Sequence, residues 1–117
     1  MTRLIETEYQ LHVNCVKFFK YKYQRVLLVH IPNENKHHVR FRNKLKLMGL
    51  KKGVPDLMIY KRTEFFVGLA IELKSKKGRA SPEQKEVLQE LKNQGWKTFI
   101  INNIDDFMRE VDDYMKL

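Results

Sequence analysis

The chain has 117 residues, a 43% share of apolar residue types and a formal net charge of +9. This length suits one domain over residues 1–117 with a single core. No apolar run is long enough to cross a membrane, and the first residues lack the apolar core of a signal peptide, so we expect a cytoplasmic protein. The only cysteine, Cys15, excludes an internal disulfide and a cysteine-rich zinc site, and is most simply a small buried side chain.

The positive charge is unevenly distributed. Residues 36–52 contain seven Lys or Arg, two His and no acid, a second basic cluster follows at residues 74–79, and the stretch from residue 105 is acidic. A solvated basic surface is one interpretation, but this segregation favours a face that binds a polyanion such as nucleic acid. The candidate nucleic-acid-binding residues are Lys36, Arg40, Arg42, Lys44, Lys51, Lys52, Lys76, Lys77 and Arg79.

The first predicted element is an amphipathic helix over residues 4–23, in which apolar side chains, Tyr9 included, fill one broad arc at roughly 100° per residue. Glu8 and His12, one turn apart, fall inside this arc. A buried carboxylate is costly unless it is paired or holds a cation, so Glu8 needs a partner. For His12 we favour a satisfied core or supporting residue over a ligand. His30, His37 and His38 are exposed or contact DNA, and no histidine spacing is typical of a zinc site.

The middle of the chain predicts three strands and a basic helix. Residues 25–31 form a strand that Pro32-Asn33 ends, and residues 36–48 form a helix that Gly49 ends. Residues 54–60 and 65–74 form two further strands, and the four residues between them are few enough for a hairpin connection.

Two helices and a strand complete the chain. Ser81, Pro82 and Gln84 have the spacing of an N-cap, a first helical residue and a capping-box partner, and Gly95 ends this helix. Residues 96–101 form the last strand, and Asn103 caps a final helix with acids in its first turn. The order α-β-α-β-β-α-β-α predicts an α/β fold with helices covering both sides of a mixed sheet.

The predicted hairpin carries two acids and a lysine, with sixteen positions from Asp56 to Glu72. Glu72 and Lys74 are two residues apart and share one face of an extended strand, and antiparallel pairing brings Asp56 beside them. On the same face, Gly68 and Ala70 should leave room above the sheet.

This trio can hold a hard divalent cation. Mg²⁺ takes one or two carboxylates together with substrate phosphate. Asp56 and Glu72 would supply the carboxylates, with a backbone carbonyl near Leu73 as a third oxygen. Lys74 would orient or deprotonate an attacking water, which points to phosphodiester cleavage. A hairpin salt bridge between Lys74 and either acid is the alternative on spacing alone.

The strongest motif evidence comes from four segments: Gly53-Val-Pro-Asp56-Leu, Glu72-Leu-Lys74, Gly78-Arg-Ala-Ser-Pro-Glu-Gln84 and Leu91-Lys-Asn-Gln-Gly95. Together they resemble the VRR-NUC domain of the PD-(D/E)XK nuclease superfamily over nearly the whole chain. The resemblance implies a restriction-endonuclease-like mixed sheet flanked by helices. It implies Asp56 and Glu72 as Mg²⁺ or Mn²⁺ ligands and Lys74 as the catalytic lysine, and it suggests that Glu8 and Gln84 complete the site.

Alternatives remain open for two of these residues. A capping box alone accounts for Gln84, although Gln84 also lies on the inward stripe of its helix, three, four and seven residues before Val87, Leu88 and Leu91. Glu8 can instead pair with His12 or Lys74.

The chain is similar to small phage and bacterial members of the family, which implies a homodimer acting on branched DNA such as Holliday junctions, in a bacterium or phage-infected cell. A branched substrate cut on both strands needs two active sites, which is a physical reason to expect a dimer. No small-molecule cofactor is expected. The alternatives are a non-catalytic nucleic-acid-binding module on the nuclease fold, or a basic adaptor for acidic proteins.

Overall fold

The computed structural model describes residues 6–32 and 38–117 of the chain. Its elements follow the predicted order, so the α/β fold class is confirmed. Among the described helices, none combines the length and apolar character that a membrane span requires. The elements are α1 (Glu8–Lys22), β1 (Leu27–His30), α2 (Val39–Leu47), β2 (Leu57–Tyr60), β3 (Gly68–Leu73), α3 (Pro82–Asn93), β4 (Trp96–Ile101) and α4 (Ile104–Met115).

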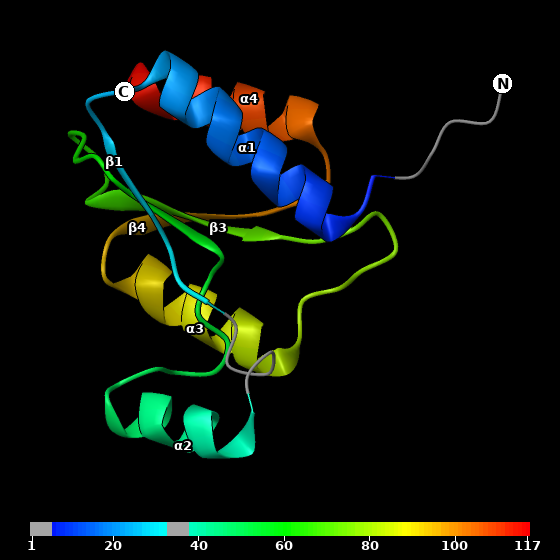
Figure 1. Cartoon of the computed structure of the whole chain (residues 1–117). Coiled ribbons are helices and arrows are strands. Elements are labelled where there is room, and N and C mark those ends of the chain that lie inside the picture. The colour runs from blue at the N-terminus through cyan, green and yellow to red at the C-terminus, as the bar shows by residue number, and fades with distance from the viewer. Residues whose placement is uncertain (1–5, 33–37) are drawn as a thin grey trace, which may run out of the picture.

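Within the described residues, four strands form one mixed sheet in the order β1-β2-β3-β4. β1 and β3 both pair with β2 in antiparallel fashion, and β3 pairs with β4 in parallel. A parallel pair needs a crossover, and α3 provides it. Figure 1 shows α1 and α4 together on one face of the sheet and α3 on the other. The helices therefore cover both faces, as expected.

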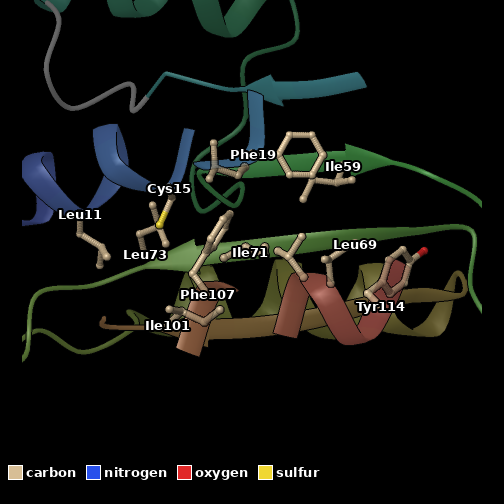
Figure 2. Packing of buried hydrophobic residues seen from close by; sticks show 12 residues of the cluster. Leu11, Cys15, Phe19, Ile59, Leu69, Ile71, Leu73, Ile101, Phe107 and Tyr114 are labelled. Carbon is tan, nitrogen blue, oxygen red and sulfur yellow. The ribbon is translucent and has the colours of Figure 1, made fainter. Parts of the chain in front are cut away.

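The core lies between the sheet and the pair of helices α1 and α4 (Figure 2). Leu69, Ile71 and Leu73 alternate along β3 and are fully buried in this core, so Ala70 and Glu72 face the opposite side, towards α3. Burial of this kind stabilises the fold by about 1.5 to 3 kcal/mol for each large apolar side chain. The helices contribute the fully buried residues Leu11, Cys15, Phe19, Phe107, Val111 and Tyr114.

Cys15 is one of these core residues, as its apolar interpretation predicted. Burial raises the pKa of its thiol to about 12, so the reactive thiolate is suppressed.

Helix α1 begins later than predicted. Thr7 has an extended backbone and caps the helix, because its hydroxyl accepts a hydrogen bond from the Gln10 N–H at 3.0 Å and its own N–H donates to Gln10 Oε1 at 2.9 Å. The predicted start at residue 4 lies outside the described residues, and residues 6 and 7 precede the helix. The buried stripe is also narrower than the predicted arc: Tyr9 is 76% exposed, and Glu8 is an exposed first-turn residue.

The two strands β2 and β3 are shorter than predicted, so Asp56 directly precedes β2 and only Glu72 lies within a strand. β2 begins at Leu57 and β3 at Gly68, whereas the sequence pattern indicated residues 54 and 65. The Thr63 hydroxyl accepts hydrogen bonds from the N–H groups of Phe65 and Phe66, which holds this segment in a turn. Val67, which directly precedes β3, is exposed.

The expected room above Gly68 does not exist. A Cβ atom built at Gly68 would lie 2.3 Å from the indole ring of Trp96, which covers this end of β3. The glycine therefore accommodates a tryptophan, and the opening on this face lies at the other end of the strand, beside Glu72.

Helix α2 lies apart from the sheet, beneath α3 in Figure 1, and has no buried residue. It begins at Val39, with the His38 side chain accepting a hydrogen bond from the Arg40 N–H. The predicted helix began at residue 36, which lies outside the described residues, as do Asn33 and His37.

Candidate metal centre

Asp56 and Glu72 meet where β2 and β3 pair. Leu57 lies opposite Ile71, so Asp56, one residue earlier, lies opposite Glu72. Oδ2 of Asp56 accepts a hydrogen bond of 2.8 Å from the Leu73 N–H, which fixes this carboxylate against β3. The hairpin geometry expected from the sequence thus brings the two acids together.

The first turn of α1 adds a third acid. One carboxylate oxygen from each of Glu8, Asp56 and Glu72 lies within 4.8 Å of the other two. Glu8 reaches this cluster from an exposed position, not from the buried arc that the periodicity indicated. Three carboxylates at this separation repel one another unless a proton or a cation is held between them.

Glu72 is the most constrained of the three, since the residue is only 2% exposed. Its Oε1 atom lies 3.3 Å from Lys74 Nζ and accepts a hydrogen bond of 3.1 Å from Gln84 Nε2. Its Oε2 atom is buried, and no hydrogen-bond partner for it exists among the described residues. A buried carboxylate oxygen without a partner is energetically costly. An oxygen-binding cation at Oε2 would remove this cost, so the residues present fit a divalent ion.

The protonation of Glu72 reflects the same environment. Burial, and then the negative charge of Asp56, raise the pKa of the Glu72 carboxyl to about 8, against the lowering effect of Lys74. Without a cation this carboxyl therefore holds its proton near neutral pH, whereas a bound cation would favour the ionised form.

Gln84 serves both of the roles considered for it. Its Oε1 atom accepts a 2.8 Å hydrogen bond from the Ser81 N–H and completes the capping box of α3. Because an N–H donor faces Oε1, the amide must turn Nε2 in the opposite direction, where it donates to Glu72. The start of α3 and the orientation of Glu72 are thus coupled through one side chain.

These groups line a cavity of about 70 Å³ between the end of the sheet and the start of α3. Small-molecule sites are far larger, at roughly 300 Å³ or more. The cavity therefore suits an ion with its waters. Lys74 lies on its wall together with the three acids, and Lys51 and Lys52 also line it.

Gly53 sets the position of the segment that enters β2. Its φ angle is +88°, and a Cβ atom there would lie 2.7 Å from the carbonyl oxygen of Glu83. A side chain would be both strained and in collision with the backbone. Glycine thus lets the chain before Asp56 pack directly on the first turn of α3, which carries Gln84.

The candidate nucleic-acid-binding residues that the structure describes divide into three groups. Lys51 and Lys52 line the cavity, and Lys52 also forms an exposed ion pair of 3.7 Å with Glu83. The loop between β3 and α3 exposes Lys76, Lys77 and Arg79. Helix α2 carries exposed Arg40 and Lys44 and half-buried Arg42, none of which lines the cavity, and Lys36 lies outside the described residues.

Two histidines beside the acids were missed as candidate site residues. The rings of His12 and His30 are 4.4 Å apart between centroids and perpendicular, and a ligand atom from each lies within 4.8 Å of the other and of Asp56. The spacing of His12 one turn after Glu8 was the available signal, but the contact with His30 depends on the packing of β1 beside α1.

Comparison with known proteins identifies the family to which the chain belongs. The model of the VRR-NUC domain family matches residues 2–103. A solved structure described as a "VRR_NUC domain protein" is 26% identical, with a TM-score of 0.81, and the match covers 97% of this chain and 91% of that one. None of the curated proteins compared with the chain matches it. The chain belongs to the VRR-NUC domain family, a PD-(D/E)XK nuclease family, which implies nuclease activity and a nucleic-acid substrate.

The raised pKa of Glu72 predicts a stability difference that depends on pH. In the metal-free protein the native Glu72 carboxyl keeps its proton up to about pH 8, while the unfolded state loses it near the ordinary value of 4.5. The unfolded state therefore binds fewer protons between these values, and this residue's contribution to stability falls as pH rises. Glu72→Gln removes this ionisation, so the metal-free variant should be more stable than the parent at pH 8. The expected difference in the free energy of unfolding is a few kcal/mol, the free energy to which a pKa shift of this size corresponds.

Urea unfolding in EDTA at pH 5 and pH 8 measures this difference, with Glu64→Gln, at an exposed acid, as the control. An equal effect of Glu72→Gln at both pH values would contradict the assigned environment.

Proposed function

We propose that this protein is a metal-dependent DNA endonuclease that hydrolyses phosphodiester bonds and prefers branched DNA. The main support is the buried Oε2 atom of Glu72, which has no hydrogen-bond partner in the described part of the chain and lies inside a three-carboxylate cluster, in a member of a nuclease family. Mg²⁺ or Mn²⁺ is the proposed ion, because the donors around it are carboxylate oxygens. The proposed ligands are Asp56, Glu72, the backbone carbonyl of Leu73 and Glu8.

When bound, the ion would supply positive charge that stabilises the attacked phosphate and acidifies water. The side chains of the site would orient the metal ligands and the attacking water. Asp56 is held in one orientation by the Leu73 N–H, and Glu72 by Gln84, so the donor atoms are ordered before substrate arrives. Lys74, whose Nζ faces the same cavity, would hold the attacking water in line with the scissile bond.

The basic groups suit a phosphate backbone. Lys51 and Lys52, at the cavity, would contact the phosphates that flank the scissile bond, and Lys76, Lys77 and Arg79 would extend this contact along the strand. Such contacts position the duplex without reading its sequence, which is compatible with selection by DNA shape. A homodimer would provide the two active sites that symmetric cleavage of a branched junction needs.

Loss of one metal ligand should abolish cleavage. We expect Asp56→Asn to reduce the cleavage rate by more than about 100-fold, since even residues that only support metal ligands contribute 10- to 100-fold. The protein should remain folded and bind DNA with similar affinity, because the amide keeps the volume of the carboxyl. The assay incubates four-way, flapped and linear DNA with Mg²⁺, with Mn²⁺ or with EDTA, and Glu64→Gln serves as the control.

Substantial cleavage by a pure Asp56→Asn preparation would contradict the assigned site. If no DNA structure yields a metal-dependent product with the unchanged chain, the protein is instead a binding module that keeps the nuclease fold.

Gln84 can be tested separately from its capping role. Ser81→Ala and Gln84→Ala each remove half of the same capping box and should each destabilise the protein by about 1 kcal/mol. Only Gln84→Ala also removes the donor to Glu72, so only this variant should lose roughly 10- to 100-fold in cleavage rate at saturating metal. Equal losses in the two variants would mean that Gln84 acts only through the helix.

The basic loop should act by neutralising phosphates. Joint replacement of Lys76, Lys77 and Arg79 by Ala should weaken DNA binding and reduce the slope of log affinity against log salt by about 1 for each phosphate that is no longer neutralised. Lys20→Ala is the control, since Lys20 is exposed three turns away from Glu8 along α1. Fluorescence anisotropy over a salt series measures both slopes, and an unchanged slope in the triple variant would exclude the loop from the interface.

A further inference from the structure

A second group of metal-binding atoms adjoins the acid cluster. His12, His30 and Asp56 each offer one ligand atom, and these three atoms lie within 4.8 Å of one another. They come from α1, β1 and the segment entering β2. Glu8 and His12 are four residues apart on α1, so they project from one face of the helix in successive turns. Asp56 belongs to both groups.

The hydrogen bonding of His30 suits a metal ligand. Its Nδ1 atom lies 2.8 Å from the backbone carbonyl oxygen of Asp56. A carbonyl only accepts, so Nδ1 carries the proton and the lone pair of the neutral ring is on Nε2. Histidines that ligate metals commonly donate their other ring N–H to a backbone carbonyl in this way, which fixes both the tautomer and the ring orientation. The same carbonyl oxygen also accepts a hydrogen bond of 3.3 Å from the N–H of Ile31, the residue after β1. This second bond fixes the position of the carbonyl beside the paired strands β1 and β2.

The donor set differs from that of the acid cluster. Glu8, Asp56 and Glu72 offer only oxygen, which suits Mg²⁺. Two imidazoles with one carboxylate instead suit first-row transition ions such as Mn²⁺, Co²⁺ and Zn²⁺, and imidazole is a poor ligand for Mg²⁺. The two groups should therefore select different ions, although they share one residue.

We propose that His12, His30 and Asp56 form a second divalent-cation site, selective for first-row transition ions over Mg²⁺. The Asp56 carboxylate would be shared between this site and the acid cluster. With both sites occupied, the two ions would lie near each other, as in two-metal phosphodiesterases. The site goes beyond the proposed function, since it can bind an ion whether or not the acid cluster supports cleavage.

Co²⁺ is the probe, because its visible absorption reports nitrogen coordination without any DNA. The metal-free full-length chain is titrated with Co²⁺ in excess Mg²⁺, which competes for the acid cluster, and binding is followed by absorption and calorimetry. We expect one Co²⁺ per chain to persist under these conditions. His30→Gln and His12→Gln should each weaken this binding by at least about tenfold. His38→Gln, at the exposed cap of α2, is the matched control and should leave it unchanged.

Thermal melts of each variant verify that it is folded. Because His30 is exposed, His30→Gln should fold like the parent. Parent-like Co²⁺ affinity in folded His30→Gln overturns the proposal, as does an equal loss in His38→Gln. Retained Co²⁺ binding in a chain that cleaves no DNA would count against the endonuclease and not against this site. Mg²⁺-dependent cleavage without Co²⁺ binding would count only against this site.

Discussion

The structure depends most on how the buried carboxylate of Glu72 is satisfied. One of its oxygens is held by Lys74 and Gln84, and the other has no partner among the described residues. Leaving a buried polar atom without a hydrogen bond costs about 1 to 3 kcal/mol, and the cost is higher when the group is charged. Together with the repulsion from Asp56, this makes the metal-free ionised site a strained state. The strain is relieved by a proton at low pH or by a cation, and a cation is the solution that supports chemistry.

The fold serves to keep that carboxylate in place. Antiparallel pairing sets Asp56 opposite Glu72, and the parallel crossover returns α3 along the same face so that Gln84 reaches the buried acid. On the other face of β3, Leu69, Ile71 and Leu73 pack into the hydrophobic core and hold the strand in place. Gly53 allows the entry to β2 to lie directly on α3. Rigid elements thus position the central donors, and only Glu8 reaches in from an exposed helix end.

Much of this could be predicted from the sequence, because the informative signals are local. Alternation placed Glu72 opposite to the core residues of β3, and the capping-box spacing located the start of α3 correctly. The failures involve contacts between distant segments. Periodicity could not show that the Trp96 ring fills the space above Gly68, nor that His12 meets His30. The Thr63 turn also outweighed the strand propensity of the residues after it, since its side chain competes for backbone N–H groups.

A bound ion would satisfy the Glu72 oxygen that lacks a partner within residues 6–32 and 38–117. Anomalous diffraction from crystals grown with Mn²⁺ tests it directly, because the signal locates the ion independently of any assay. We expect a peak among Glu8, Asp56 and Glu72, within about 2.5 Å of Glu72 Oε2. A map without a peak there, at Mn²⁺ concentrations that support cleavage, would show that Glu72 Oε2 is not a metal ligand.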